Sequence, residues 1–402
     1  MTTEFDIELQ QRLDALREQN LLRELRRIDS PQAPRLQIGG KPFLNFSSND
    51  YLGLANDPVL KEAVIQAIEK FGAGSGASRL ICGSLAPHHE LEETLADFKK
   101  TEAALVFSTG YAAALGTIGA LAGKNDIIII DKLVHASIVD AAKLSGAKLR
   151  VFAHNDLEDL EKILKWAVTK PVSGVWLAKE RPRIFIVTES VFSMDGDFAP
   201  LKEIVALKEK YGAWLMVDEA HATGIFGKDG RGFAESCGIS QQIEIQMGTL
   251  GKALGASGGY ICGSRSLIDY LINRARSFIF STAPVPATAA AATAAIHFVK
   301  SKPGEKRRKL LWDRVTQFHS KLKTQNSKLS AIIPLLIGDE KKAVQIAADL
   351  RARGILIPAI RYPTVARGTS RLRLTMTAAH TAEDVGKLCA TLTNLKLEIR
   401  NS

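Results

Sequence analysis

The 402-residue sequence predicts an α/β protein: a large three-layer αβα domain with a mainly parallel sheet, followed by a smaller carboxy-terminal α/β domain. Short, continuously apolar runs recur along the chain, as expected of strands buried on both faces. Segments with helical spacing separate these runs, which indicates strand-helix alternation. The pattern changes near residue 290. We therefore expect an amino-terminal segment over 1–50, the large domain over 51–290 and the smaller domain over 291–402.

The amino-terminal segment contains one amphipathic pattern and one short apolar run. Leucines recur near helical spacing, with arginine and glutamate between them, at Leu9, Leu13, Leu16, Leu21, Leu22 and Leu25. This spacing predicts a helix that is ended by Pro31 and Pro34. A short strand is predicted over 42–46.

The large domain begins with a helix whose first turn is marked by Asp57 and Pro58 and whose end is marked by Gly72. Buried strands are then predicted at the apolar runs 104–107, 127–130, 184–187 and 214–217. Helical periods are found at 89–98, 112–121, 157–167 and 201–211, and an alanine-rich helix at 288–299. The smaller domain is predicted to contain helices at 306–322, 342–353 and 382–395, with strands at 331–337, 355–358 and 370–376.

Composition indicates an ordinary globular protein, with 46% hydrophobic and 24% charged residues. The formal net charge of +10 is spread along the chain apart from the basic run 306–309, so a solvated helix face is favoured over a nucleic-acid site. The four cysteines are far apart and show no metal-ligand or disulfide spacing. The start of the chain does not fit a signal peptide, and prolines interrupt the apolar stretch 281–299. We expect a cytoplasmic protein without a metal.

Polar residues follow several predicted strands, where ligands gather in parallel α/β sheets. Gly110 and Tyr111 open a helix, whose N–H groups can hold a phosphate. His135 follows the next strand, and the loop after 184–187 offers hydroxyl and carboxylate groups. Asp218 and His221 follow the strand at 214–217, where ionisable groups are costly unless they are paired or used.

Lys252 stands in a run of small residues over 248–259. Alone, this pattern is more typical of a loop lysine in a glycine-rich turn. Together with the polar groups above it suggests pyridoxal phosphate (PLP), which needs a lysine for a Schiff base, a carboxylate for its pyridine nitrogen and a phosphate cradle. Lys252, Asp218 and the turn at Gly110 and Tyr111 meet these needs, and His135 is placed to cover the ring.

Six motifs, in order along the chain, resemble those of the α-oxoamine synthases, PLP enzymes of fold type I with an aspartate-aminotransferase-like fold. They occupy 49–53, 74–79, 135–137, 191–196, 218–224 and 248–255. The resemblance implies that Lys252 carries the cofactor and moves protons at the substrate, and that Asp218 pairs with the ring nitrogen. It also implies roles in cofactor binding for His221 and Ser193 at the ring oxygen, His135 on the ring face, and Gly110, Tyr111 and Thr249 at the phosphate.

The resemblance further implies a homodimer with sites at the interface, in which Ser281 and Thr282 reach a phosphate in the partner subunit. Arg373, the second arginine of an Arg-Leu-Arg pattern, is expected to grip the amino-acid carboxylate, because a guanidinium can donate two parallel hydrogen bonds. Arg371 is interpreted as one of the alternating polar side chains of a half-exposed strand.

Segments 152–156, 363–365 and 377–380 most resemble the branch that condenses L-alanine with a pimeloyl thioester, of coenzyme A or a carrier protein, in biotin synthesis. The implied substrate residues are Arg23, Asn49, His135, Thr364 and Arg373. Arg23 matches the amino-terminal substrate arginine of that branch only loosely, because Arg26 and Arg27 lie close to it in the sequence. Tyr362 and Ala366 depart from the commonest form of that branch, which leaves the acyl preference open.

Three alternatives remain at this stage. One is a glycine C-acetyltransferase or another synthase that joins an acyl-coenzyme A to an amino acid, because the lysine motif also occurs there. Another is a non-enzymatic PLP-binding regulator, although the first fifty residues show no helix-turn-helix pattern. The third, an inactive subunit of a heteromer, is disfavoured by the presence of Lys252, Asp218 and His221.

Overall fold

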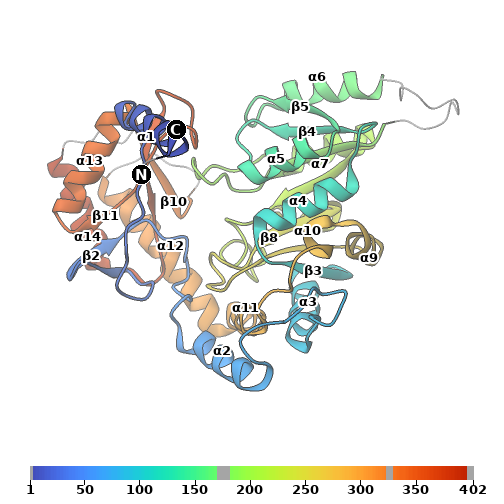
Figure 1. Ribbon diagram of the computed structural model, residues 1–402, viewed down its shortest axis with the longest axis horizontal. Helices are drawn as coiled ribbons and strands as arrows, with labels where there is room; N and C mark the ends of the chain where they lie inside the picture. The colour runs from blue at the N-terminus through green and yellow to red at the C-terminus, as the bar shows by residue number, and fades with distance from the viewer. Residues whose placement is uncertain (1–2, 170–181, 323–328, 396–402) are drawn as a thin grey trace, which may run out of the picture. The chain divides into compact units, whose positions relative to one another are not determined.

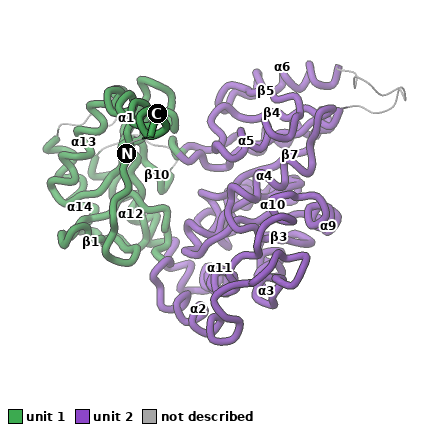
Figure 2. The backbone as a smooth tube through the Cα atoms, in the orientation of Figure 1, with its two compact units in different colours: residues 1–53, 194–196, 309–402 green, residues 54–193, 197–308 purple. Residues whose placement is uncertain are grey.

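The computed structural model describes residues 3–169, 182–322 and 329–395. The chain divides into two compact units, shown in green and purple in Figure 2. Unit 1 is drawn from residues 1–53, 194–196 and 309–402, and unit 2 from residues 54–193 and 197–308. The amino-terminal segment thus belongs to the same unit as the carboxy-terminal residues, whereas the sequence suggested a separate segment and a boundary near residue 290.

Unit 2 is organised around a seven-stranded sheet in the order β3-β9-β8-β7-β6-β4-β5 (Figure 1). The strands are β3 (Ala103–Phe107), β4 (Ile127–Asp131), β5 (Lys148–Phe152), β6 (Ile184–Glu189), β7 (Trp214–Asp218), β8 (Ile245–Thr249) and β9 (Gly259–Gly263). Only β9 among them runs antiparallel to its neighbours. The predicted mainly parallel sheet is confirmed.

Helices surround this sheet in three groups of contacting helices, as the α/β pattern predicts. One group is α4 (Gly110–Leu121), α5 (Ala136–Leu144), α9 (Arg265–Arg274) and α10 (Arg276–Ile279). A second is α6 (Leu157–Val168), α7 (Leu201–Tyr211) and α8 (Phe233–Cys237), with a 3₁₀ turn at Ser240–Gln242. A third contains α2 (Pro58–Phe71), α3 (Ala86–Lys99) and α11 (Pro286–Lys300).

The core of unit 2 lies on both faces of the central strands. All five residues of β4 and all six of β6 are buried, including Ile128, Ile129 and Ile186 with no exposed surface. Removing such apolar side chains from water is the main stabilising contribution to folding. The core therefore fixes the strand ends, and these ends carry the polar residues discussed below.

Unit 1 holds two three-stranded sheets, ordered β1-β2-β11 and β10-β13-β12. Its elements are α1 (Glu4–Glu18), β1 (Arg35–Ile38), β2 (Lys41–Asn45), β10 (Ile332–Gly338), α13 (Glu340–Ala352), β11 (Ile355–Leu356), β12 (Ala359–Ile360), β13 (Ser370–Thr375) and α14 (Ala382–Asn394). The long helix α12 (Lys302–Leu322) crosses the boundary between the units in sequence.

Helix α1 ends earlier than the leucine spacing predicts, at Glu18 rather than near Pro31. Asn20 adopts the left-handed conformation with φ of 56°, and the N–H groups of Leu21 and Leu22 then donate to the carbonyl oxygen of Leu16. Asparagine tolerates this conformation better than most residues, so it ends the helix. Among the described residues, no helix is long and apolar enough to cross a membrane.

Candidate active site

The carboxyl ends of six strands meet at one edge of the unit 2 sheet, because β3, β4, β5, β6, β7 and β8 point the same way. The residues predicted from sequence to bind a cofactor end or follow these strands, apart from Ser281 and Thr282. This edge is the place where parallel α/β sheets bind ligands. The candidate site is therefore built from segments that are far apart in the sequence.

Lys252 lies in the loop between β8 and β9, and its Nζ is 2.8 Å from Nε2 of His221. The loop holds itself in shape: the Thr249 hydroxyl donates to the carbonyl oxygen of Gly258 at 2.9 Å and accepts from the N–H of Gly251. Gly255 has φ of +63°, and its N–H closes a turn onto the carbonyl oxygen of Lys252. The lysine is thus presented on a defined turn.

Asp218 is the last residue of β7 and is 5% exposed. Burial raises the pKa of its carboxyl group, and the charges of Lys252 and His135, with the Ala220 N–H, act in the opposite direction. One of its oxygens accepts that N–H at 2.9 Å. A buried carboxylate of this kind is stabilised by a cationic partner, and a protonated pyridine nitrogen is a partner of the required charge.

Glu189, which the sequence reasoning did not single out, is the last residue of β6 and the register partner of Asp218. Burial and the negative charge of Asp218 raise its pKa well above the ordinary value, against the positive charge of Lys252. It accepts from the backbone N–H groups of His135 and Ser193. The strand-end rule would have found Glu189, because it stands at the same edge as Asp218.

His135 begins α5, and its Nδ1 accepts a hydrogen bond from the N–H of Ser137 at 3.2 Å and lies 2.8 Å from the Ser137 hydroxyl. Desolvation by the surrounding protein lowers the pKa of the ring, with a further contribution from Lys252, against the charges of Asp218 and Asp140. An accepting Nδ1 places the proton of a neutral ring on Nε2. The ring can therefore offer an N–H donor near the lysine.

The start of α4 lies against the end of β8. A Cβ atom on Gly259 would lie 2.5 Å from Cα of Gly110, and one on Gly110 would lie 3.8 Å from Cβ of Thr249. The Thr109 hydroxyl caps the helix by accepting from the N–H of Ala112. The first N–H groups of a helix have no partner within it, and together with the Thr249 hydroxyl they suit a phosphate.

The other predicted cofactor residues are placed less directly. Ser193 follows β6 and is largely buried, while the Tyr111 hydroxyl donates to Asp140 at 2.6 Å, so Tyr111 can serve a phosphate through its backbone. Thr282 forms a β-bridge with Ser78. Within the described residues, neither Ser281 nor Thr282 forms a hydrogen bond with Lys252.

Apart from His135, which lies in unit 2, the predicted substrate residues form two groups in unit 1. Arg373 donates from Nη1 to Oδ1 of Asn49 at 3.0 Å, and the Tyr51 hydroxyl also bonds to this arginine. Arg23 donates to the Thr364 hydroxyl at 3.4 Å and to the carbonyl oxygen of Tyr362 at 3.3 Å. Each group thus brings together two of the residues that the sequence predicted.

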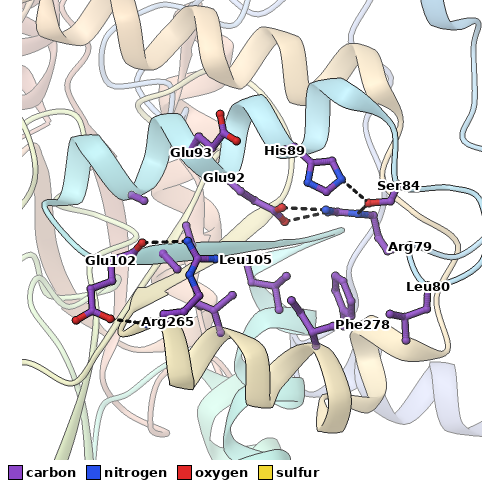
Figure 3. Close-up of a pocket in the computed structure, with 15 residues that line it drawn as sticks. Arg79, Leu80, Ser84, His89, Glu92, Glu93, Glu102, Leu105, Arg265 and Phe278 are labelled. Atoms are coloured by element: carbon purple, nitrogen blue, oxygen red, sulfur yellow. Dashed lines mark hydrogen bonds and ion pairs between the residues drawn. The ribbon is translucent and has the colours of Figure 1, made fainter.

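A cavity of about 560 Å³ in unit 2 is lined by other residues (Figure 3). Arg79 grips Glu92 there with two hydrogen bonds of 2.9 Å, and its Nε donates to Ser84. Glu92 also accepts the N–H of Val106 in β3. Arg79, from the motif at 74–79, therefore anchors its loop to α3.

A family model described as aminotransferase class I and II matches residues 41–392. The 8-amino-7-oxononanoate synthase of Geotalea daltonii is 46% identical over 388 residues, covering 95% of this chain and 96% of the relative. The chain belongs to the 8-amino-7-oxononanoate synthase family. A solved member of this synthase family, from Francisella tularensis, is 28% identical with a TM-score of 0.71, covering 88% of this chain and 98% of that one.

A serine palmitoyltransferase from S. paucimobilis, solved with a PLP–myriocin aldimine, is 33% identical with a TM-score of 0.87 and covers 96% of both chains. The predicted fold type I architecture, the PLP cofactor and the acyltransferase class are confirmed for this member of the synthase family. The protein is an enzyme, so the alternative of a non-enzymatic regulator is set aside. The residues present fit the cofactor: a lysine, a buried carboxylate and a helix start face one sheet edge.

Proposed function

We propose that the protein condenses L-alanine with a pimeloyl thioester, of coenzyme A or a carrier protein, and releases carbon dioxide, the free thiol and 8-amino-7-oxononanoate. The observation that carries the proposal is the placement of Lys252 beside His221, at the edge that also holds buried Asp218, in a chain 46% identical to a named synthase. The cytoplasm is the compartment we propose for this reaction.

PLP, when bound, supplies an electron sink for negative charge at the α-carbon of alanine. Asp218 would hold the proton of the ring nitrogen, while His221 and Ser193 would orient the ring oxygen. The Lys252 amine removes the α-proton and later returns it, acting as base and then as acid. Nε2–H of His135 would donate to the acyl carbonyl and stabilise the negative charge that develops on its oxygen.

The substrate residues of unit 1 supply orientation. Arg373 binds the alanine carboxylate in two parallel hydrogen bonds, and Asn49 holds the guanidinium plane. Arg23 and Thr364 contact the acyl substrate. We further propose a homodimer in which Ser281 and Thr282 reach the phosphate of the partner subunit.

Reduction of the PLP-loaded protein with borohydride, followed by mass spectrometry of its peptides, tests the assignment of Lys252. We expect the pyridoxyl group on Lys252, and we expect Lys252→Ala to lose the adduct and to lower turnover by about 10³-fold or more. Lys100→Ala is the matched control, because Lys100 is an exposed lysine of α3's carboxyl end. An adduct on another lysine, or turnover that survives in Lys252→Ala, would refute the assignment.

A serine-using synthase with a longer acyl donor is the second candidate, because the serine palmitoyltransferase structure matches with a TM-score of 0.87. Initial rates with alanine, glycine and serine against pimeloyl, acetyl and palmitoyl thioesters separate the candidates. We expect the highest kcat/KM for alanine with pimeloyl thioester. A preference for serine with palmitoyl thioester would favour the second candidate.

A further inference from the structure

His154 stands in the segment 152–156, to which the proposed function gives no task. We propose that His154 is a positioning residue for the active site: its ring ties the turn that carries His135 to the segment that carries Ser193. This inference rests on the proposed function, because His135 and Ser193 have their roles there.

The ring of His154 lies between two carboxylates. Nδ1 is 2.9 Å from Oδ1 of Asp131, and Nε2 is 2.7 Å from Oδ2 of Asp197. The rings of His154 and Phe192 are perpendicular, with a centroid distance of 4.4 Å and an interplanar angle of 90°. The histidine thus contacts residues of two strand ends at once.

Asp131 transmits this contact to the turn before His135. It is the last residue of β4 and is fully buried. Its Oδ1 also accepts from the N–H of Leu133 at 2.8 Å, and its Oδ2 accepts from the N–H of Asn155 at 2.9 Å. One carboxylate therefore fixes both the turn after β4 and the turn that carries His154.

Asp197 connects His154 to the segment that carries Ser193, as Asp131 connects it to the turn before His135. Its carbonyl oxygen accepts from the N–H of Phe192, the residue before Ser193, at 3.0 Å. The Asn155 amide donates to Asp197 Oδ2 and to the carbonyl oxygen of Phe198. The segment around Ser193 is thus closed on itself and held against His154.

A positively charged His154 ring matches its two carboxylate neighbours. Both ring nitrogens face carboxylate oxygens, so a protonated ring donates two hydrogen bonds at once. Although burial lowers the pKa of His154, its bonds to Asp131 and Asp197 raise it to about 10. Without the ring, two carboxylates would face each other with no cation between them.

The test compares His154→Gln with Arg183→Gln. Arg183 pairs with Asp126 at 2.8 Å and 2.9 Å just before β6 and β4, the opposite ends of the same two strands. In cofactor-free protein, we expect amide exchange over 131–137 and 192–198 to accelerate by about tenfold in His154→Gln and to stay unchanged in Arg183→Gln. In loaded enzyme, we expect kcat to fall by about tenfold in His154→Gln, with KM for alanine within about threefold.

Unchanged exchange and kcat in His154→Gln, or equal losses in Arg183→Gln, would overturn the inference. If His154→Gln does not fold, Asp197→Asn decides instead, since it keeps the ring and removes one of its two charge partners; an unchanged variant there would again overturn it. If the wild-type protein lacks synthase activity, the proposed function fails, and exchange in cofactor-free protein still shows whether His154 orders the two segments.

Discussion

Arg373 is oriented by neighbours in its own unit. Asn49 accepts from its Nη1 at 3.0 Å, the Tyr51 hydroxyl bonds to it, and both the arginine and Tyr51 are buried. A side chain fixed in this way loses little conformational freedom when a carboxylate binds. Planarity also matters, because a lysine ammonium can copy the charge of the group but not its two parallel donors.

Arg373→Lys is therefore expected to raise KM for alanine by about tenfold or more, with a smaller effect on kcat. Steady-state kinetics at saturating acyl thioester measures both values. Arg371→Lys is the control two residues earlier on β13, where the guanidinium bonds to Asp195 and to the carbonyl oxygen of Met194. Equal increases in KM for the two variants would contradict the assignment of Arg373 to the substrate.

Helix α3 is joined to the end of β7 by a buried ion pair. Lys99 donates to Oε2 of Glu219 at 2.6 Å, and both side chains are 1% exposed. Glu219 Oε1 accepts from the N–H of Ala234, and Lys99 also donates to the carbonyl oxygen of Arg231. Because Glu219 follows Asp218 directly, its pairing with Lys99 also offsets a second negative charge beside Asp218.

Lys99→Met should destabilise the fold by about 3–5 kcal/mol, because it leaves a buried carboxylate without its cation. Chemical denaturation monitored by fluorescence gives the free energy of unfolding. Adding Glu219→Gln to Lys99→Met is expected to recover part of this loss. The exposed pair of Lys100 and Asp97 provides the comparison, and Lys100→Met should cost less than about 1 kcal/mol.

The contacts of His154 with Asp131 and Asp197 make the stability of the fold depend on pH. The pKa of His154 is raised from 6.5 to about 10 in the folded protein, so its contribution is fully present below pH 6.5 and is lost as the pH rises through about 10. The difference in Tm between wild type and His154→Gln should therefore narrow between about pH 7 and pH 10. A difference that stays constant over this range would contradict a protonated ring.

For the whole molecule, the proposed dimer can be tested by mixing two inactive variants. If Thr282 serves the partner subunit's site, a heterodimer of Lys252→Ala and Thr282→Val has one site with both changes and one site with neither. Random exchange of subunits then restores about a quarter of wild-type activity. If Thr282 acts within its own subunit, or the protein is a monomer, mixing restores nothing. Sedimentation of each variant checks that subunits still associate.

Sequence patterns predicted the continuously apolar strands better than the strands whose apolar pattern is interrupted. β4, β6 and β7 were found because both of their faces are buried. The strand β5 was missed because Lys148 and Arg150 interrupt its apolar pattern at the sheet edge, and β9 because glycines bound it.

Sequence patterns also found only part of the candidate site. Asp218 and His135 were singled out from the sequence but Glu189 was not, although Glu189 ends β6 just as Asp218 ends β7. The contact of His154 with Asp197 joins residues 43 positions apart, and only the fold brings them together.

Unit 1 combines segments from the two ends of the chain, and this affects the order in which the protein can fold during translation. β2 pairs with β11, joining Leu44 to Ile355, so the first sheet of the chain waits for a partner synthesised about 310 residues later. Residues 54–308 hold every strand of the seven-stranded sheet and leave the ribosome before that partner exists. The hairpin of β1 and β2 is synthesised early, but its sheet is one of the last to be completed. A chain stopped near residue 330 would expose this hairpin without its third strand, β11.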